Sequence, residues 1–215
     1  MAQRRRKPKA TRATSGESRA APDRAAVIDA ALSLFATRGW RETTLADIAQ
    51  AAGTGLAAVY PMFPSKVAVL RGFMARIDAA VLAAPTDADG TVRERLFEIF
   101  MRRFDALQPN RTAMQALARD LPRDPCAALC IAQRAGRSLR AMAELSGVRT
   151  DGPLGVLRVK ALVALHLWVM RAWLGDESAD MARTMKALDQ GLDRLEMLAR
   201  SLPGARRETE AAAPG

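Results

Sequence analysis

Histidine, cysteine and aromatic residues are all scarce in this chain of 215 residues. It has one histidine, His166, and two cysteines, Cys126 and Cys130. These numbers exclude a disulfide framework and leave almost no material for a zinc site or for catalysis centred on histidine. A phosphate-binding loop and a nucleophile paired with a base are also missing from the sequence. We therefore expect a protein that is not an enzyme and that uses no metal or other cofactor.

Long apolar runs are missing as well. The longest uncharged stretch in the apolar C-terminal half, residues 161–170, is about half the length of a membrane span. The basic N-terminus has no apolar stretch of the kind that a secretory signal contains. The sequence therefore predicts a soluble, cytoplasmic protein without a membrane span.

Alanine is abundant, with 44 residues, while aromatic residues make up only 5% of the chain. Alanine has the best helix propensity, whereas strands favour β-branched and aromatic residues. The composition predicts an all-α fold.

Positive charge is concentrated at the N-terminus. Residues 1–24 contain eight Lys or Arg and two acidic residues, so they carry +6 of the formal net charge of +10. The segment 1–22 is interpreted as a disordered basic arm that contacts phosphates through Arg4, Arg5 and Arg6. A solvated tail without a partner is the alternative. At the other end, residues 203–215 are small and polar, and we expect a disordered tail.

Four helices are predicted in the first part of the chain. Asp23 begins the first and Gly39 ends it. Thr44 and Asp47 resemble a capping box that begins the second, and Ser65 begins the fourth. The predicted helices cover residues 23–38, 44–52, 56–62 and 65–83.

A glycine turn, Gly53-Thr54-Gly55, joins the second helix to the short third one, which is the plan of a helix-turn-helix. Here the sequence resembles the DNA-binding domain of TetR-family bacterial transcriptional repressors. The resemblance is carried by Ala30-Ala31, Leu34-Phe35, Gly39-Trp40, Thr43-Thr44, Asp47-Ile48-Ala49, Ala52-Gly53, Val59-Tyr60, Phe63-Pro64-Ser65-Lys66 and Leu70. It implies a three-helix DNA-binding domain over residues 23–70 and a helical bundle over residues 71–202 that binds a ligand and forms a homodimer.

The resemblance also implies which residues contact double-stranded DNA. In the family, a tyrosine of the recognition helix and a lysine after its phenylalanine contact phosphates, and here these are Tyr60 and Lys66. Thr44 can offer its hydroxyl and amide to a phosphate. The residues expected at DNA are Thr43, Thr44, Gly55, Leu56, Ala57, Ala58, Tyr60, Lys66, Arg4, Arg5 and Arg6.

The start of the recognition helix departs from the family, which usually has polar residues there. Gly55, Leu56, Ala57 and Ala58 cannot make the bidentate hydrogen bonds that discriminate bases. Contact with thymine methyl groups and readout of DNA shape remain available. The scaffold predicts DNA binding, but its base-reading surface is weak.

Five more helices are predicted, over residues 91–107, 111–119, 125–145, 153–174 and 178–202. The last carries an apolar stripe with a 3.5-residue repeat, which favours packing along another helix. We assign that stripe to the dimer interface, and burial within one subunit is the alternative. Its residues are Met181, Met185, Leu188, Leu192 and Leu195.

Methionines and aromatics in the C-terminal half are candidates for a pocket that binds a small apolar effector, although such residues also form ordinary core. His166 would be either a core histidine or the residue that anchors the effector. Cys126 and Cys130, four residues apart, are interpreted as small buried hydrophobes. The candidate pocket residues are Phe97, Met101, Phe104, Met114, Met142, His166, Trp168 and Met170.

Residues 110–198 are similar to a second group, the TetR-like accessory protein of ubiquinone biosynthesis. The similarity lies in Leu121-Pro122, residues 147–151, Trp173-Leu174, Asp176-Glu177-Ser178, Thr184 and Leu188-Asp189. It implies an apolar pocket for isoprenoid lipid and a degenerate DNA-reading helix. Two hypotheses result. The first is a homodimeric repressor that leaves a palindromic operator when it binds an effector, and the second is a lipid-binding accessory protein.

Overall fold

A computed structural model describes residues 23–84 and 89–201. This described part contains helices and no strands, which confirms the predicted all-α fold. Two short 3-10 helices, η1 (Gln108–Asn110) and η2 (Leu121–Arg123), interrupt the series of α-helices. The α-helices are α1 (Arg24–Arg38), α2 (Leu45–Ala51), α3 (Leu56–Val59), α4 (Lys66–Ala83), α5 (Val92–Leu107), α6 (Arg111–Asp120), α7 (Pro125–Leu145), α8 (Gly152–Leu174) and α9 (Ala182–Ser201). The predicted segments 1–22 and 203–215 lie outside the described residues.

Local capping explains where the first helices begin and end. The Asp23 carboxylate accepts a hydrogen bond from the Ala25 amide at the start of α1. Gly39 ends α1 with φ of 86°, a conformation that glycine adopts without steric cost. Thr44 and Asp47 form the predicted capping box at α2, and Ser65 caps α4. These boundaries confirm the prediction from sequence to within a residue or two.

Two helices are shorter than predicted. α3 ends at Val59, before Pro61, rather than at residue 62. α9 begins at Ala182 rather than at residue 178. The carboxylate of Asp176 accepts hydrogen bonds from the hydroxyls of Ser178 and Thr184, and these bonds hold the preceding residues in a non-helical turn.

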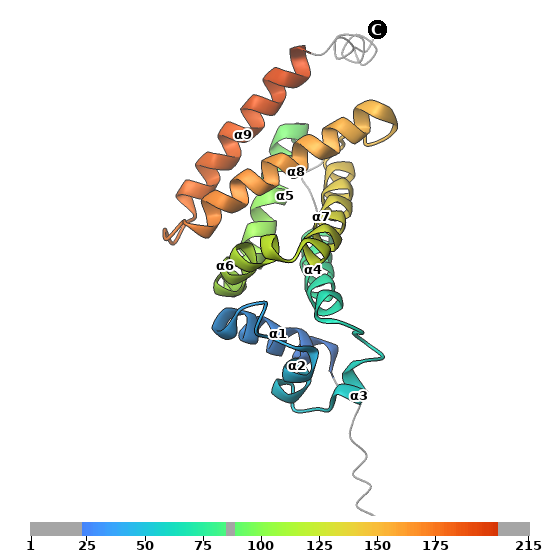
Figure 1. Cartoon of the computed structure of the whole chain (residues 1–215). Coiled ribbons are helices and arrows are strands. Elements are labelled where there is room, and N and C mark those ends of the chain that lie inside the picture. The colour runs from blue at the N-terminus through green and yellow to red at the C-terminus, as the bar shows by residue number, and fades with distance from the viewer. Residues whose placement is uncertain (1–22, 85–88, 202–215) are drawn as a thin grey trace, which may run out of the picture.

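The helices form two groups that α4 connects (Figure 1). α1, α2 and α3 lie at one end of the molecule, and α5 to α9 form the larger bundle. The boundary predicted after Leu70 falls inside α4, so this one helix contributes to both groups. Further contacts between the groups join α1 to α6 and α4 to α7. A continuous apolar core therefore runs through both groups.

A buried ionic cluster holds the middle of α4 against the bundle. The Asp78 carboxylate accepts hydrogen bonds from Arg103 of α5 at 2.7 Å and from Arg134 of α7 at 2.5 Å. The Ser138 hydroxyl donates to the same carboxylate at 2.6 Å. Because Asp78 and Arg103 are both buried, each charge depends on the other for compensation.

α8 is the described helix that has the length and apolar composition of a membrane span. The apolar part of α8 is therefore longer than the uncharged stretch 161–170 on which the prediction from sequence was based. In the structure α8 packs against α6, α7 and α9. Its Leu162, Val169 and Trp173 are buried there.

Candidate nucleic-acid interface

The segment from α2 to α3 forms a compact helix–turn–helix unit. Thr44 lies at the N-terminus of α2, where its hydroxyl and amide both hydrogen bond to the Asp47 carboxylate, at 2.5 and 2.8 Å. These bonds lower the pKa of Asp47. Gly53 makes the turn with φ of 70°, and Val59 and Phe63 anchor α3 in the core. Thr44 is exposed, but the hydroxyl and amide that were expected to meet a phosphate are both bonded to Asp47.

The outer face of α3 is exposed and almost entirely apolar. Leu56 is 43% exposed and Tyr60 is 58% exposed, and Gly55 and Ala57 are exposed as well. Ala58 is half-buried. The Tyr60 hydroxyl is the only hydrogen-bonding side-chain group from Gly55 to Pro61.

Lys66 points toward the protein rather than outward. Its ammonium nitrogen donates to the carbonyl oxygens of Trp40 at 2.7 Å and of Thr43 at 3.1 Å. It also lies 4.5 Å from the centroid of a Trp40 ring. Burial lowers the pKa of Lys66. In this structure Lys66 fastens the loop before α2 to the start of α4, whereas the family resemblance implied a phosphate contact.

Thr43 is a correction to the residues expected at DNA. Its side chain is fully buried, and its hydroxyl donates to the Gly39 carbonyl at 2.7 Å. A side chain in this position shapes the loop and cannot contact DNA. The arm residues Arg4, Arg5 and Arg6 lie outside the described residues.

Arg41 was not among the residues predicted to contact DNA. It is exposed in the same loop, three residues before Thr44. Its position beside the N-terminus of α2 was the available signal, because that terminus was already expected to face a phosphate. Gln50, near the end of α2, is also exposed and was not selected.

Two carboxylates of the larger bundle hold the group formed by α1, α2 and α3 through Trp40. The Trp40 amide donates to Asp120 at 3.0 Å, and its indole nitrogen donates to Asp124 at 3.1 Å. Asp120 ends α6 and Asp124 precedes α7. Gly39 makes this approach possible, because a Cβ atom there would lie 2.7 Å from an Asp120 carboxylate oxygen.

The eight candidate effector residues differ in how deeply they are buried. Phe104, Met142 and His166 are buried, and Phe97, Met101, Met114 and Met170 are half-buried. Trp168 is instead exposed. Of the buried members, Phe104 and His166 lie together, with 5.6 Å between their ring centroids.

His166 is enclosed without a hydrogen bond to its Nδ1 atom from any described residue. Burial and then the positive charge of Arg103 lower the pKa of His166 to about 3. The imidazole is therefore neutral at physiological pH. The sequence left a hydrogen-bonded core histidine and an effector anchor as two possibilities, and the burial found here comes without the expected bond at Nδ1 from the described part of the chain.

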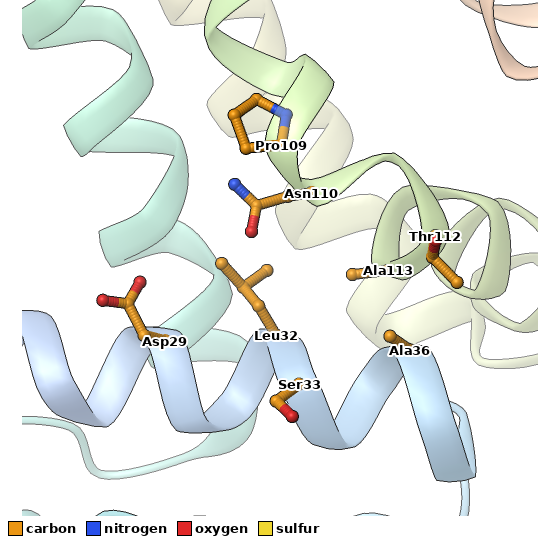
Figure 2. A pocket seen from close by; sticks show the side chains of 8 residues that line it. All are labelled: Asp29, Leu32, Ser33, Ala36, Pro109, Asn110, Thr112 and Ala113. Atoms are coloured by element: carbon orange, nitrogen blue, oxygen red, sulfur yellow. The ribbon is translucent and has the colours of Figure 1, made fainter.

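Two surface hollows are lined by described residues, and neither contains a candidate effector residue. One lies between α1 and the start of α6, as Figure 2 shows. Asp29, Leu32, Ser33 and Ala36 line its α1 side, and Pro109, Asn110, Thr112 and Ala113 line the other. The second is formed by Asp89, Gly90, Glu94, Arg95 and Glu98. No group of three or more potential metal ligands occurs within residues 23–84 and 89–201.

Much of the apolar stripe predicted at the dimer interface packs within the subunit. Met181, Leu188 and Leu192 are buried, and Met185 and Leu195 are half-buried. α9 lies along α8, where Gly191 allows a close approach, because a Cβ atom there would meet Leu165 and Trp168. The alternative, burial within one subunit, is what the structure has for this stripe. Cys126 and Cys130 also differ from expectation, since both are exposed.

Apolar side chains remain exposed elsewhere on α8 and α9. On α8 these include Leu157, Leu167 and Trp168, and on α9 they are Met197 and Leu198. Leu167, Met197 and Leu198 are each more than 60% exposed. We name these five residues the outer apolar face.

Residues 27–72 match the family model of the bacterial regulatory proteins of the tetR family. Among solved structures, the TetR transcriptional regulator from Nitrosomonas europaea ATCC 19718 is 22% identical with a TM-score of 0.65, covering 81% of this chain and 98% of that one. A tetR-family regulator from Streptomyces coelicolor is 21% identical with a TM-score of 0.59, covering 89% of each chain. A TetR regulator from Rhodococcus sp. RHA1 is 18% identical with a TM-score of 0.53, covering 78% of this chain and 94% of that one. No curated protein matches the chain.

Proposed function

We propose that the chain, whose residues 27–72 match the tetR-family model and whose fold is that of solved TetR regulators, is a cytoplasmic, homodimeric repressor of that family. It binds a palindromic operator and leaves it when a small apolar effector binds the regulatory bundle. The observation that carries the proposal is the exposed face of α3, which stands outside the core while Val59 and Phe63 hold the helix from within.

Phosphate contacts supply most of the affinity in this proposal. The exposed Tyr60 hydroxyl provides a hydrogen-bond donor next to α3, and exposed Arg41 provides a positive charge in the loop before α2. Arg4, Arg5 and Arg6 of the N-terminal arm add contacts that do not depend on base sequence. Binding should therefore weaken steeply as the salt concentration rises.

The outer apolar face supports the homodimer. Large apolar side chains that gather on two neighbouring helices usually mark an interaction surface. α8 and α9 lie at the end of the molecule away from α3 (Figure 1), so pairing through them leaves both copies of α3 free for DNA. A symmetric dimer that places two recognition helices on one duplex requires an operator with inverted half-sites.

The contacts between the two groups of helices support regulation by an effector. Asp78 ties α4 to the bundle near Arg103, and Arg103 lies close enough to His166 to influence its titration. An effector that inserts near His166, Phe104 and Met142 changes the packing of α5 and, through Asp78, the position of α4. It releases DNA if it binds more tightly to the arrangement that does not fit the operator.

Selection of random duplex DNA on the purified full-length protein at physiological salt, followed by sequencing, tests the proposal. We expect enrichment of an inverted repeat. General, salt-sensitive binding without an enriched sequence would contradict it. The variant Tyr60→Phe removes the exposed hydroxyl and should weaken binding to all duplexes by a similar factor.

The lipid-binding accessory role is not favoured, because the complete α2–turn–α3 unit lies within the part of the chain that matches the tetR-family model. Extraction of the purified protein with organic solvent tests this alternative independently. Recovery of isoprenoid lipid in stoichiometric amount, together with a failed DNA selection, would reverse the preference.

A further inference from the structure

The recognition helix presents an apolar contact surface where base edges are read. Leu56, Ala57 and Tyr60 have the spacing that places side chains on one face of a helix. All three are exposed, and the Tyr60 amide donates to the Leu56 carbonyl at 2.8 Å, which keeps the helical spacing to that point. Val59 is directed into the core instead. The leading end of this surface therefore consists of the Leu56 and Ala57 side chains alone.

An apolar surface discriminates among base pairs in a defined way. In the major groove only thymine exposes an apolar group, its 5-methyl, whereas guanine, cytosine and adenine expose donors and acceptors. Covering those polar edges with Leu56 removes their water without offering a hydrogen bond, which is unfavourable. Covering a thymine methyl instead buries apolar area on both partners, which is favourable. Both effects favour thymine opposite α3.

The segment that follows α3 is anchored in the core by Phe63. The ring of Phe63 packs directly against Gly72 of α4, where a Cβ atom would lie 2.8 Å from it. The guanidinium of Arg24, the first residue of α1, lies 4.3 Å from the centroid of the same ring. Phe63 thus anchors the turn that follows α3 against α1 and α4, while α3 itself packs against α2.

We propose that Leu56, with Ala57 beside it, reads the 5-methyl groups of thymines in each half-site of the operator. This inference rests on the proposed function, because it assumes that α3 enters the major groove. Leu56 is then the specificity-determining residue, and the thymine 5-methyl is the group that it recognises.

The test removes or adds single methyl groups on the DNA. The enriched operator is synthesised with deoxyuridine in place of each conserved thymidine, which deletes the methyl group and leaves every hydrogen-bonding atom in place. We expect about fourfold weaker binding at the contacted position in one half-site, and about fifteenfold when both half-sites are changed. Where the contacted thymidine is replaced by cytidine, 5-methylation of that cytosine should recover about fourfold in affinity.

Protein variants assign the effect to Leu56. In Leu56→Ala the affinity for the thymidine operator falls, and the thymidine and deoxyuridine operators bind equally. Leu56→Met, which retains an apolar contact, keeps a preference for thymidine. Leu129→Ala is the matched control, because Leu129 is also an exposed leucine, on α7, and this variant should keep both the affinity and the preference.

The outcomes separate this inference from the proposed function. If an operator is enriched but wild-type protein binds its thymidine and deoxyuridine forms equally, methyl readout is wrong and the DNA-binding function stands. If the preference persists in Leu56→Ala, the assignment to Leu56 is overturned. If no sequence is enriched at all, both proposals fail.

Discussion

The indole nitrogen of Trp40 donates a hydrogen bond to the Asp124 carboxylate at 3.1 Å, although the two residues lie 84 positions apart. Trp40 follows α1 in the DNA-binding group, and Asp124 precedes α7 in the regulatory bundle. Lys66, at the start of α4, binds the carbonyl of the same tryptophan. Directional bonds on one residue therefore join the two groups, in addition to the apolar packing of α1 and α4.

Replacing Trp40 by phenylalanine should weaken this junction. Phenylalanine removes the N–H group, which costs about 1 kcal/mol in the free energy of unfolding, and its smaller ring loses further packing at a fully buried position. Urea denaturation measures the sum. Asp124→Ala also removes the cap of α7, so a double-mutant cycle isolates the pair, and Trp40→Phe should cost about 1 kcal/mol less in the Asp124→Ala background than in wild type. Additive effects would show that the bond contributes nothing.

Replacing Lys66 by methionine distinguishes an internal role from a phosphate contact. Methionine fills the space of the lysine stem but cannot bind the carbonyls of Trp40 and Thr43. We expect weaker DNA binding with an unchanged slope of affinity against salt, because the ammonium neutralises no phosphate. In the comparison variant Arg41→Ala the slope should fall by about one. A slope reduced by about one in Lys66→Met would restore the role that the family resemblance implied.

Asp78→Asn should destabilise the protein strongly. The change leaves Arg103 buried without its counter-charge, which costs about 3 kcal/mol in the free energy of unfolding. Asp29→Asn is the control, because Asp29 pairs with Arg76 at a similar distance, 2.7 Å, but at the surface, where such a pair contributes less than about 1 kcal/mol. Chemical denaturation at one fixed protein concentration compares them. Equal losses would mean that the Asp78 cluster is not desolvated.

The stability of the protein should depend on the protonation of His166. Its pKa is lowered to about 3 in the folded chain from the ordinary value of 6.5, so between these pH values the unfolded chain binds a proton that the folded chain does not. The free energy of unfolding should therefore fall as the pH drops from about 6.5 towards 3, by up to about 1.4 kcal/mol per pH unit from this group.

Urea denaturation at several pH values between 7 and 4 measures this dependence in wild type and in His166→Leu. The variant should lose stability less steeply on acidification. Because the chain has only one histidine, NMR of its imidazole gives an independent readout. An imidazole that titrates near pH 6.5 in the folded protein would contradict its burial as the neutral form.

A charge on the outer apolar face should separate the subunits. Leu167 is 62% exposed on α8, so glutamate there is solvated in the monomer and buried without a partner in the proposed dimer. Sedimentation velocity should find a dimer for wild type and a monomer for Leu167→Glu, with unchanged helix content. Leu129→Glu, at an equally exposed leucine of α7, should remain dimeric. A dimeric Leu167→Glu would place the interface elsewhere.

The sequence alone determined most of the helix boundaries and the identity of the DNA-binding unit. Those features depend on neighbouring residues: a carboxylate or hydroxyl at Asp23, Thr44 and Ser65 caps a helix within three positions, and Gly39 ends one through its own φ angle. The end of α3 before Pro61 and the late start of α9 were missed. In the second case the cause was a carboxylate, Asp176, that satisfies groups up to eight positions away.

Only the tertiary structure decided what each exposed or apolar side chain contacts. A stripe such as Met181, Leu188 and Leu192 shows that a helix face is covered, but its periodicity is the same whether the cover is α8 of one subunit or a second subunit. The direction of Lys66 and the burial of Thr43 depend on the loop around Trp40, and the position of that loop depends on Asp120 and Asp124, about 80 residues away. Contacts between residues far apart in the sequence depend on how the whole chain packs, so local sequence patterns do not predict them.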